Sequence, residues 1–174
     1  VETIDLELGL ADLETVEKRI DRQKRVARSG DKQAKAEVEL FESIRDHLSN
    51  GSPARTFEVP DALLPAYREA CLLTAKPLLY VANIDEDGLG EGNLHSQALL
   101  EHAAKAGAET VLICGKVEAE LSELDDDDKR EFLADLGIDE PGLNRLIRAA
   151  YELLKLVTFF TAGPKEIRAW TIQQ

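Results

Sequence analysis

The chain has 174 residues, 44% hydrophobic and 32% charged, which is typical of a soluble globular protein of one domain or a domain with an appendage. Its net charge of −13 argues against a protein that coats nucleic acid or an anionic membrane along its whole surface, although a local basic patch is compatible with it. No stretch reaches the roughly 20 apolar residues of a membrane-spanning helix and no signal peptide is visible, so we expect a cytoplasmic protein without membrane contact.

Residues 2–28 are predicted to form one long helix, because apolar residues recur at alternating steps of three and four. Gly30 then ends this helix, and Asp31 can cap a second helix over residues 31–49. Two helices joined by so short a loop must run antiparallel, which predicts a coiled-coil hairpin. The apolar seam expected between the helices consists of Leu6, Leu13, Val16, Ile20, Ala27, Ala34, Val38, Phe41 and Leu48.

The tip of the predicted hairpin is basic, although the chain as a whole is acidic. Between positions 18 and 35 lie eight Lys and Arg residues, opposed only by Asp21 and Asp31. Two interpretations are open: a solvated helical face, or a protruding finger whose cations contact the phosphates of RNA. No aromatic residue lies among these cations, so we expect neither base stacking nor DNA specificity. The candidate RNA contacts are Arg22, Lys24, Arg25, Arg28 and Lys32.

After a linker and a short helix near residues 60–73, the pattern changes to strands that alternate with helices. Residues 77–82 and 110–114 are short apolar runs rich in strand-forming residues, and a predicted helix at 93–106 separates them. Strands that are apolar on both faces indicate a parallel sheet covered on both sides. The later predicted elements are helices at 117–136 and 141–155, a short strand at 157–161 and a final stretch at 167–172.

The cysteines and histidines do not have the spacing of a metal site. Cys71 and Cys114 lie far apart in apolar surroundings, so we expect both to be buried, reduced thiols. The three histidines show no ligand spacing. The aspartates at 125–128 are interpreted as a solvated turn or a helix N-terminus, in preference to a cation site. We therefore predict no metal held by this chain.

Polar or small residues follow both predicted strands at their carboxyl ends, where open α/β sheets bind ligands. Asn83 can touch a purine edge through its amide, Glu86 can accept hydrogen bonds from a donor edge, and Ile84 can offer an apolar surface to the ring. Gly115 would permit close approach of the backbone. An ordinary Asn/Asp-rich turn is the competing interpretation of this tetrapeptide. The predicted base-binding residues are Asn83, Ile84, Glu86, Cys114, Gly115 and Lys116.

Several runs of the chain resemble one family in that family's order. Residues 79–87, Leu-Tyr-Val-Ala-Asn-Ile-Asp-Glu-Asp, closely resemble the base-recognition segment of the YchF family, in the Obg-like group of P-loop nucleotide hydrolases. Residues 158–170, Thr-Phe-Phe-Thr-Ala-Gly-Pro-Lys-Glu-Ile-Arg-Ala-Trp, are similar to the start of its C-terminal TGS domain. Residues 10–18 resemble the start of its inserted helical hairpin. Further similar runs are 118–125, 132–137 and 142–151, so the resemblance covers essentially the whole chain.

The resemblance implies an α/β fold that is mostly helical overall. It would comprise the C-terminal half of a P-loop NTPase, a G-domain-like parallel sheet with helices, and the inserted antiparallel coiled-coil hairpin. The implied segments are the hairpin at 1–56, whose first turns belong to the G domain, the base-recognition half of the G domain at 57–156, and the start of a truncated TGS domain at 157–174. The chain lacks Met, begins with Val and contains no Gly-x-x-x-x-Gly-Lys-Ser/Thr motif. We therefore expect an internal fragment whose phosphate-binding loop lies upstream, although a processed terminus would also explain the missing Met.

For function, the resemblance implies a protein that binds and hydrolyses ATP, in preference to or alongside GTP, in association with the ribosome. Relatives that bind guanine carry the motif Asn-Lys-x-Asp. In this chain, Ile84 stands in place of the Lys and Glu86 in place of the Asp. The longer carboxylate side chain is out of register with the two guanine N–H donors, and misplacing such a hydrogen bond costs about 1.5–3 kcal/mol. Mg²⁺ is expected in the full-length protein, with ligands outside this chain, and no residue here would be catalytic. The alternatives are an RNA- or ribosome-binding helical module without independent catalysis, and a stable fragment without activity.

Overall fold

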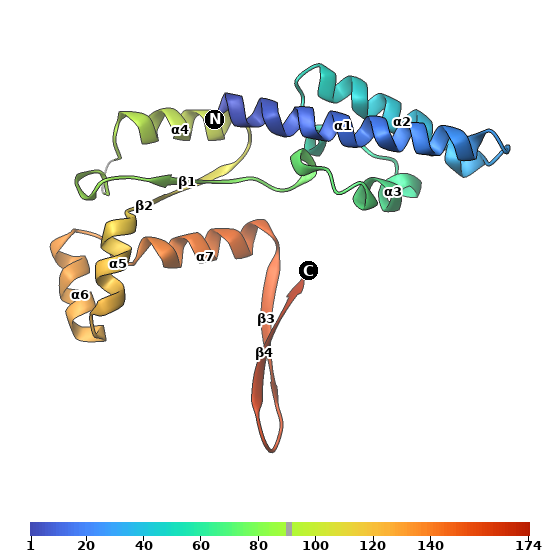
Figure 1. Ribbon diagram of the computed structural model, residues 1–174. Coiled ribbons are helices and arrows are strands. Elements are labelled where there is room, and N and C mark those ends of the chain that lie inside the picture. Colours follow the sequence, from blue (N-terminus) through green and yellow to red (C-terminus); the bar gives the residue numbers. More distant parts are fainter. Residues whose placement is uncertain (90–91) are drawn as a thin grey trace. The chain divides into compact units, whose positions relative to one another are not determined.

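Two long helices, α1 (Glu2–Ala27) and α2 (Lys32–Ser49), begin the chain in the computed structural model, which describes residues 1–89 and 92–174 (Figure 1). Both helices predicted for this part are confirmed to within one or two residues. Asp31 accepts a hydrogen bond from the Ala34 N–H at 3.0 Å and thereby caps α2. Contacts divide the chain into two units, Val1–Pro77 and Leu78–Gln174, each of which is described by itself.

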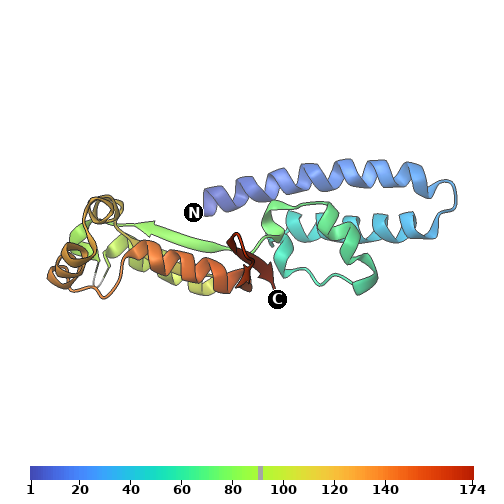
Figure 2. The ribbon, with the colours of Figure 1, turned by 90° about the horizontal axis from the view of Figure 1, so that it is seen from below.

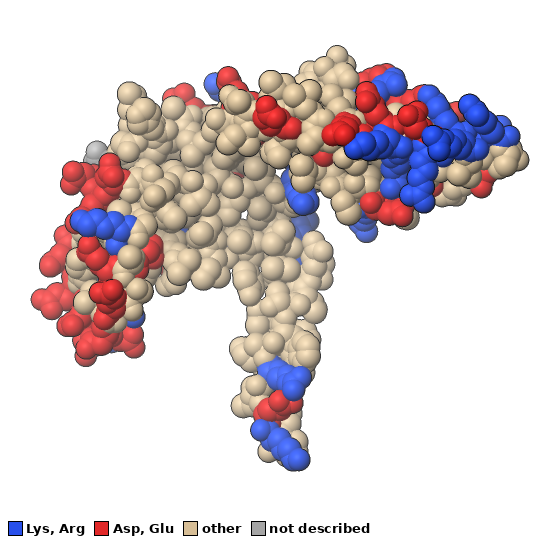
Figure 3. Space-filling model, viewed as in Figure 1, with Lys and Arg blue, Asp and Glu red and all other residues tan. Residues whose placement is uncertain are grey.

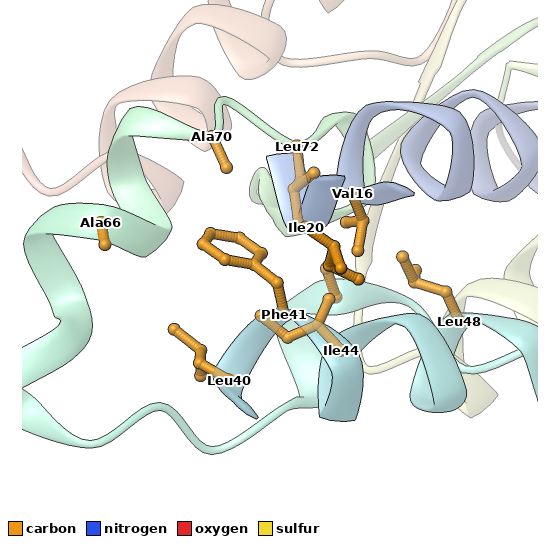
Figure 4. Close-up of a cluster of buried hydrophobic side chains, with 10 residues drawn as sticks. Val16, Ile20, Leu40, Phe41, Ile44, Leu48, Ala66, Ala70 and Leu72 are labelled. Atoms are coloured by element: carbon orange, nitrogen blue, oxygen red, sulfur yellow. The ribbon is translucent and has the colours of Figure 1, made fainter. Parts of the chain in front are cut away.

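The core of the first unit lies between α1, α2 and the segment that follows them. Val16 and Ile20 of α1 meet Phe41 and Ile44 of α2, and Leu72 closes the cluster (Figure 4). The predicted seam is confirmed for its central residues, but it is wrong at its N-terminal end.

Leu6, which was predicted to lie in the seam, is 62% exposed. The lengths of the two helices explain this difference. At 1.5 Å per residue, the 26 residues of α1 span about 39 Å and the 18 residues of α2 about 27 Å, so the first turns of α1 extend beyond α2.

The segment after the hairpin forms short elements: 3₁₀ turns at Ala54–Thr56, Asp61–Leu63 and Leu73–Ala75, and the helix α3 (Leu64–Glu69). The predicted helix near 60–73 is thus much shorter: a 3₁₀ turn takes the place of its first residues, and beyond its end the backbone turns at Cys71 with a φ of 51°. Cys71 is exposed, so the prediction that both thiols are buried is wrong for it, whereas Cys114 is buried. Both cysteines are free.

Asp12 fastens this segment to α1. Its carboxylate is 1% exposed and accepts hydrogen bonds from the N–H groups of Leu73 and Thr74, both at 2.7 Å, and from the Thr74 hydroxyl at 2.6 Å. The Thr74 hydroxyl oxygen in turn accepts from the Ala54 N–H at 2.9 Å. These bonds explain why the first compact unit extends to Pro77 instead of ending with the hairpin.

The second unit is built on two parallel strands, β1 (Leu79–Asn83) and β2 (Glu109–Ile113), which pair in register from Leu79 with Glu109 to Asn83 with Ile113. The helix α4 (Leu94–Lys105) connects them, and a capping box between Asn93 and Ser96 begins it. The helices α4 and α7 (Gly142–Leu153) lie on opposite faces of the strand pair (Figures 1 and 2). The predicted strands and this helix are confirmed with shifts of one or two residues.

The single helix predicted at 117–136 is two helices, α5 (Gly115–Glu123) and α6 (Asp126–Asp135). The chain breaks because Leu124 is extended and Asp125 caps α6, accepting hydrogen bonds from the N–H groups of Asp127 and Asp128, both at 3.0 Å. The aspartates at 125–128 therefore form a helix N-terminus, in agreement with the interpretation preferred over a cation site.

The chain ends in an antiparallel hairpin of β3 (Leu156–Ala162) and β4 (Ile167–Gln173). Its large apolar side chains, among them Phe160 and Ile167, are exposed. In the described ranges 1–89 and 92–174, no helix combines the length and apolar character needed to cross a membrane.

Candidate functional site

The carboxyl ends of β1 and β2 bring two loops together, residues 83–86 and 114–116. Asn83 pairs with Ile113 in the parallel register, and the Ile84 N–H donates to the Ile113 carbonyl at 2.8 Å. Beyond this last rung, the Gly115 N–H donates to Asn83 Oδ1 at 3.0 Å. A side-chain amide of one loop thus holds the backbone of the other at the edge where an α/β sheet binds ligands.

This bond also orients the amide of Asn83. The side chain is exposed and its oxygen is occupied by Gly115, while Nδ2 has no hydrogen-bond partner among the described residues. A Cβ atom at position 115 would lie 3.4 Å from Asn83 Oδ1, at the lower limit of ordinary van der Waals contact. The asparagine thus lies against the start of α5 with its N–H₂ group available to an acceptor on a ligand.

An ion pair links the same two loops. Lys116 Nζ lies 3.3 Å from Glu86 Oε2 and 3.8 Å from Glu120 Oε1. The hydrogen bond to Glu86 and the attraction of both carboxylates raise the pKa of Lys116. All three side chains are exposed, so the pair adds little to stability. It does occupy one oxygen of Glu86 and leaves the other oxygen to a ligand. Glu120 was missed as a neighbour of the site, although its spacing of four residues from Lys116 on a helix could have indicated it.

Two of the predicted site residues lie beneath this surface. The side chain of Ile84 is 7% exposed and packs in the core with Leu89 and Val117. That side chain fills the core below the loop and exposes little apolar surface, and the contact of Ile84 with a base stays a prediction. The Cys114 thiol is buried as well, and the Cys114 carbonyl accepts from the Glu118 N–H at 3.0 Å as α5 begins. The residues that reach the surface are Asn83, Glu86, Gly115 and Lys116.

The basic tip, defined as residues 18–35, lies at the far end of the hairpin in the first unit, where Lys and Arg side chains gather on the surface (Figure 3). The candidate contacts named from the sequence are all exposed. Lys24 is paired with Glu42 at 2.7 Å, but none of the ion pairs of the described residues includes Arg25, Arg28 or Lys32. Lys32 begins α2, where the helix dipole disfavours a cation, so its position has no explanation in the stability of the helix.

Comparison with known proteins gives consistent matches. No protein-family model matches the chain. Over 172 residues it is 49% identical to the ribosome-binding ATPase YchF of Pasteurella multocida, covering 99% of this chain and 47% of the relative. It is 44% identical over 176 residues to the protein of the same name from Bacillus subtilis, covering 100% of this chain and 48% of the relative.

Among solved structures, the YchF GTPase of Schizosaccharomyces pombe matches with a TM-score of 0.84 at 25% identity, covering 98% of this chain and 47% of that chain. The chain spans about half the length of the relatives it matches. Because the identity is high along nearly all of its residues and the fold agrees over the same extent, the resemblance of the chain to YchF proteins is confirmed.

Proposed function

We propose that this chain supplies base recognition in a protein that binds and hydrolyses ATP, in preference to or alongside GTP, in association with the ribosome. The relatives are named ribosome-binding ATPases and the solved neighbour is named a GTPase, which supports the nucleotide and the ribosome as ligands of this kind of protein. The observation that carries the proposal is the hydrogen bond between Asn83 Oδ1 and the Gly115 N–H. This bond holds the loops after β1 and β2 together in one surface, on which the Asn83 Nδ2 group has no partner among the described residues.

The chemistry of this surface favours adenine. The Nδ2 group of Asn83 would donate to a ring nitrogen that both purines possess. Glu86 keeps one oxygen free beside Lys116, which suits the single amino donor on the adenine edge. The two neighbouring N–H donors of guanine need two carboxylate oxygens, and an unmade charge-assisted hydrogen bond there costs about 1.5–3 kcal/mol. The proposed ligand is therefore ATP, with GTP binding more weakly or alongside it.

We assign phosphoryl transfer to residues outside this chain, since no P-loop motif occurs in its sequence. Mg²⁺ would be held there as well. In this assignment, residues 1–56 are the inserted coiled-coil hairpin, 57–156 the base-recognition half of a G domain, and 157–174 the start of a TGS domain. The purified 174-residue chain is expected not to release phosphate from ATP in a turnover assay. ATP hydrolysis that stays with the chain through further purification steps would contradict this assignment.

The base-reading proposal is tested by nucleotide affinity in a protein of the relatives' full length that carries these residues. Asn83→Ala removes the free donor and the bond to Gly115, and ATP and GTP should both bind about 10-fold or more weakly. Glu86→Asp shortens the carboxylate and should raise GTP affinity relative to ATP. Asp87→Asn, an exposed neighbour on the same turn, is the control and should change neither value. Ile84→Lys is unsuitable as a companion change, because it would place a lysine in the core.

A ratio of ATP to GTP affinity that stays constant in Glu86→Asp would refute the role of Glu86. Unchanged affinity for both nucleotides in Asn83→Ala would refute the site itself. Isothermal titration calorimetry with non-hydrolysable analogues of ATP and GTP separates these outcomes, because it measures binding independently of turnover.

A second function, contact with RNA or the ribosome through the basic tip, is favoured by Arg25, Arg28 and Lys32, which take part in none of the ion pairs among residues 1–89 and 92–174. Replacing Arg22, Lys24, Arg25 and Arg28 by Glu should weaken co-sedimentation with ribosomes. If four phosphate contacts are lost, the slope of log affinity against log salt should fall by about 3. The same change in charge made at Lys76, Lys105, Arg130 and Lys165, outside the tip, is the matched control. Equal binding by the two variants would contradict the role of the tip.

A further inference from the structure

One edge of β2 carries backbone groups that face away from the strand pair. In a parallel ladder, residues alternate between directing both backbone groups toward the partner strand and directing them away. The Ile113 carbonyl accepts from the Ile84 N–H, so residues 113 and 111 face β1. Thr110 and Leu112 therefore direct their N–H and C=O groups outward. The Leu112 carbonyl accepts from Arg145 Nη2 at 3.1 Å, and in the described part of the chain it is the one outward group with a partner.

This edge lines a groove within the second unit. The groove has a volume of about 390 Å³ and is bounded by Leu100 of α4 on one side and by residues of α7 on the other. Two polar atoms of its lining, Thr110 Oγ1 and Arg145 Nε, are buried without a hydrogen-bond partner among the described residues. Buried polar atoms are normally paired, so the groove is a place where polar partners are missing.

Three glutamates and the two arginines Arg145 and Arg148 line the groove, so its lining carries one net negative charge, which favours a basic occupant. Glu109 and Glu152 line it and belong to none of the ion pairs of the described residues, whereas Glu140 is held by both terminal nitrogens of Arg148, at 2.9 and 2.8 Å. The unit Leu78–Gln174 has 9 Lys and Arg against 19 Asp and Glu, a net charge of −10 (9 minus 19). Two copies of so acidic a unit repel each other, which disfavours a second copy of this chain as the occupant.

We propose that the outer edge of β2 binds an extended segment of a basic partner protein, which adds to the sheet as a further strand. The backbone of the segment would donate to the Thr110 carbonyl and accept from the N–H groups of Thr110 and Leu112, as in strand addition at other exposed sheet edges. Lys or Arg at its ends would meet Glu109 and Glu152. The four residues at 109–112 span about 13 Å of edge, enough for a short strand.

The test uses the 174-residue chain and a synthetic peptide, Lys-Thr-Val-Thr-Val-Thr-Lys with blocked ends, followed through backbone amide signals by NMR. Saturable shifts are expected at Thr110 and Leu112, and hydrogen exchange at these two amides should slow by about 10-fold or more at saturation. A peptide with alternate backbone nitrogens methylated keeps one pairing edge and should still bind. A peptide with consecutive nitrogens methylated has none and should not bind. A peptide with Glu in place of both Lys residues should bind more weakly.

A protein variant complements the peptides. Thr110→Pro removes an outward N–H without removing a bond of the β1–β2 ladder, and it should abolish peptide binding, whereas Thr110→Val keeps the N–H and should bind. If the proline variant fails to fold, the methylated peptides decide. The proposal is overturned by an absence of shifts at Thr110 and Leu112, by equal binding of the consecutively methylated peptide, or by dimerisation of the chain through these amides without peptide.

Discussion

Replacing Asp12 with alanine is expected to loosen the first unit, because three donors would lose the same buried acceptor. The carboxylate accepts from the N–H groups of Leu73 and Thr74 and from the Thr74 hydroxyl, and it is 1% exposed. The hydroxyl can turn to another acceptor, but the two N–H groups cannot. Each buried N–H left without a partner costs about 1–3 kcal/mol, so we expect a loss of about 4 kcal/mol in the free energy of unfolding of this unit.

Hydrogen exchange measured by NMR reports this loss within the unit itself. The amides of Phe41 and Ile44, whose side chains are fully buried in its core, should exchange roughly 1000-fold faster, since a tenfold change corresponds to about 1.4 kcal/mol. The amide of Val111 in the second unit serves as an internal reference. Thr74→Val keeps both N–H bonds to Asp12 and should cost only about 1–2 kcal/mol. Exchange in Asp12→Ala within tenfold of the original rate would refute the idea that this carboxylate holds the segment to α1.

Gly142→Ala should destabilise the second unit by about 1–3 kcal/mol in thermal unfolding, because a Cβ there would lie 2.9 Å from the nearest atom of β2. Gly9→Ala, in α1 with nothing within 4 Å, should instead stabilise the first unit by about 0.5–1 kcal/mol, and a loss of stability there would show an unrecognised contact. Glu86→Gln should lower the pKa of Lys116 in an NMR titration, and Glu120→Gln should lower it less, since the bond to Glu86 is the larger cause. Because that pKa is raised on folding, the stabilising effect is present at neutral pH and is lost only as the pH rises through the folded-state pKa, above the ordinary 10.5.

Much of the local structure could be predicted because its causes lie close together in the chain. Apolar residues at helical spacing predicted α1 and α2, and Asp31 marked the cap between them. Short apolar runs predicted β1 and β2, and the polar residues after each run indicated where the two loops would meet. The break between α5 and α6 was missed, although Asp125 is a capping residue, because the apolar pattern continues across it.

Exposure was harder to predict, because it depends on which parts of the chain pack over a residue. Asp12 looks like a solvated helical residue until Leu73 and Thr74, about sixty positions later, enclose it. Ile84 follows a strand at a place where a ligand contact was expected, but its side chain turns into the core. Cys71 has apolar neighbours in sequence and is nonetheless exposed at a turn.

The sequence by itself determined the order of helices and strands, the two strand-end loops, the concentration of positive charge at residues 18–35 and the resemblance to the YchF family. Only the tertiary structure decided that Asn83 and Gly115 are bonded, that Glu86 is paired with Lys116, and that the outer edge of β2 lines a groove. The reason is physical: periodicity and caps act over a few neighbouring residues, whereas these contacts join residues about thirty positions apart or more, and they exist only once the strands and helices have packed.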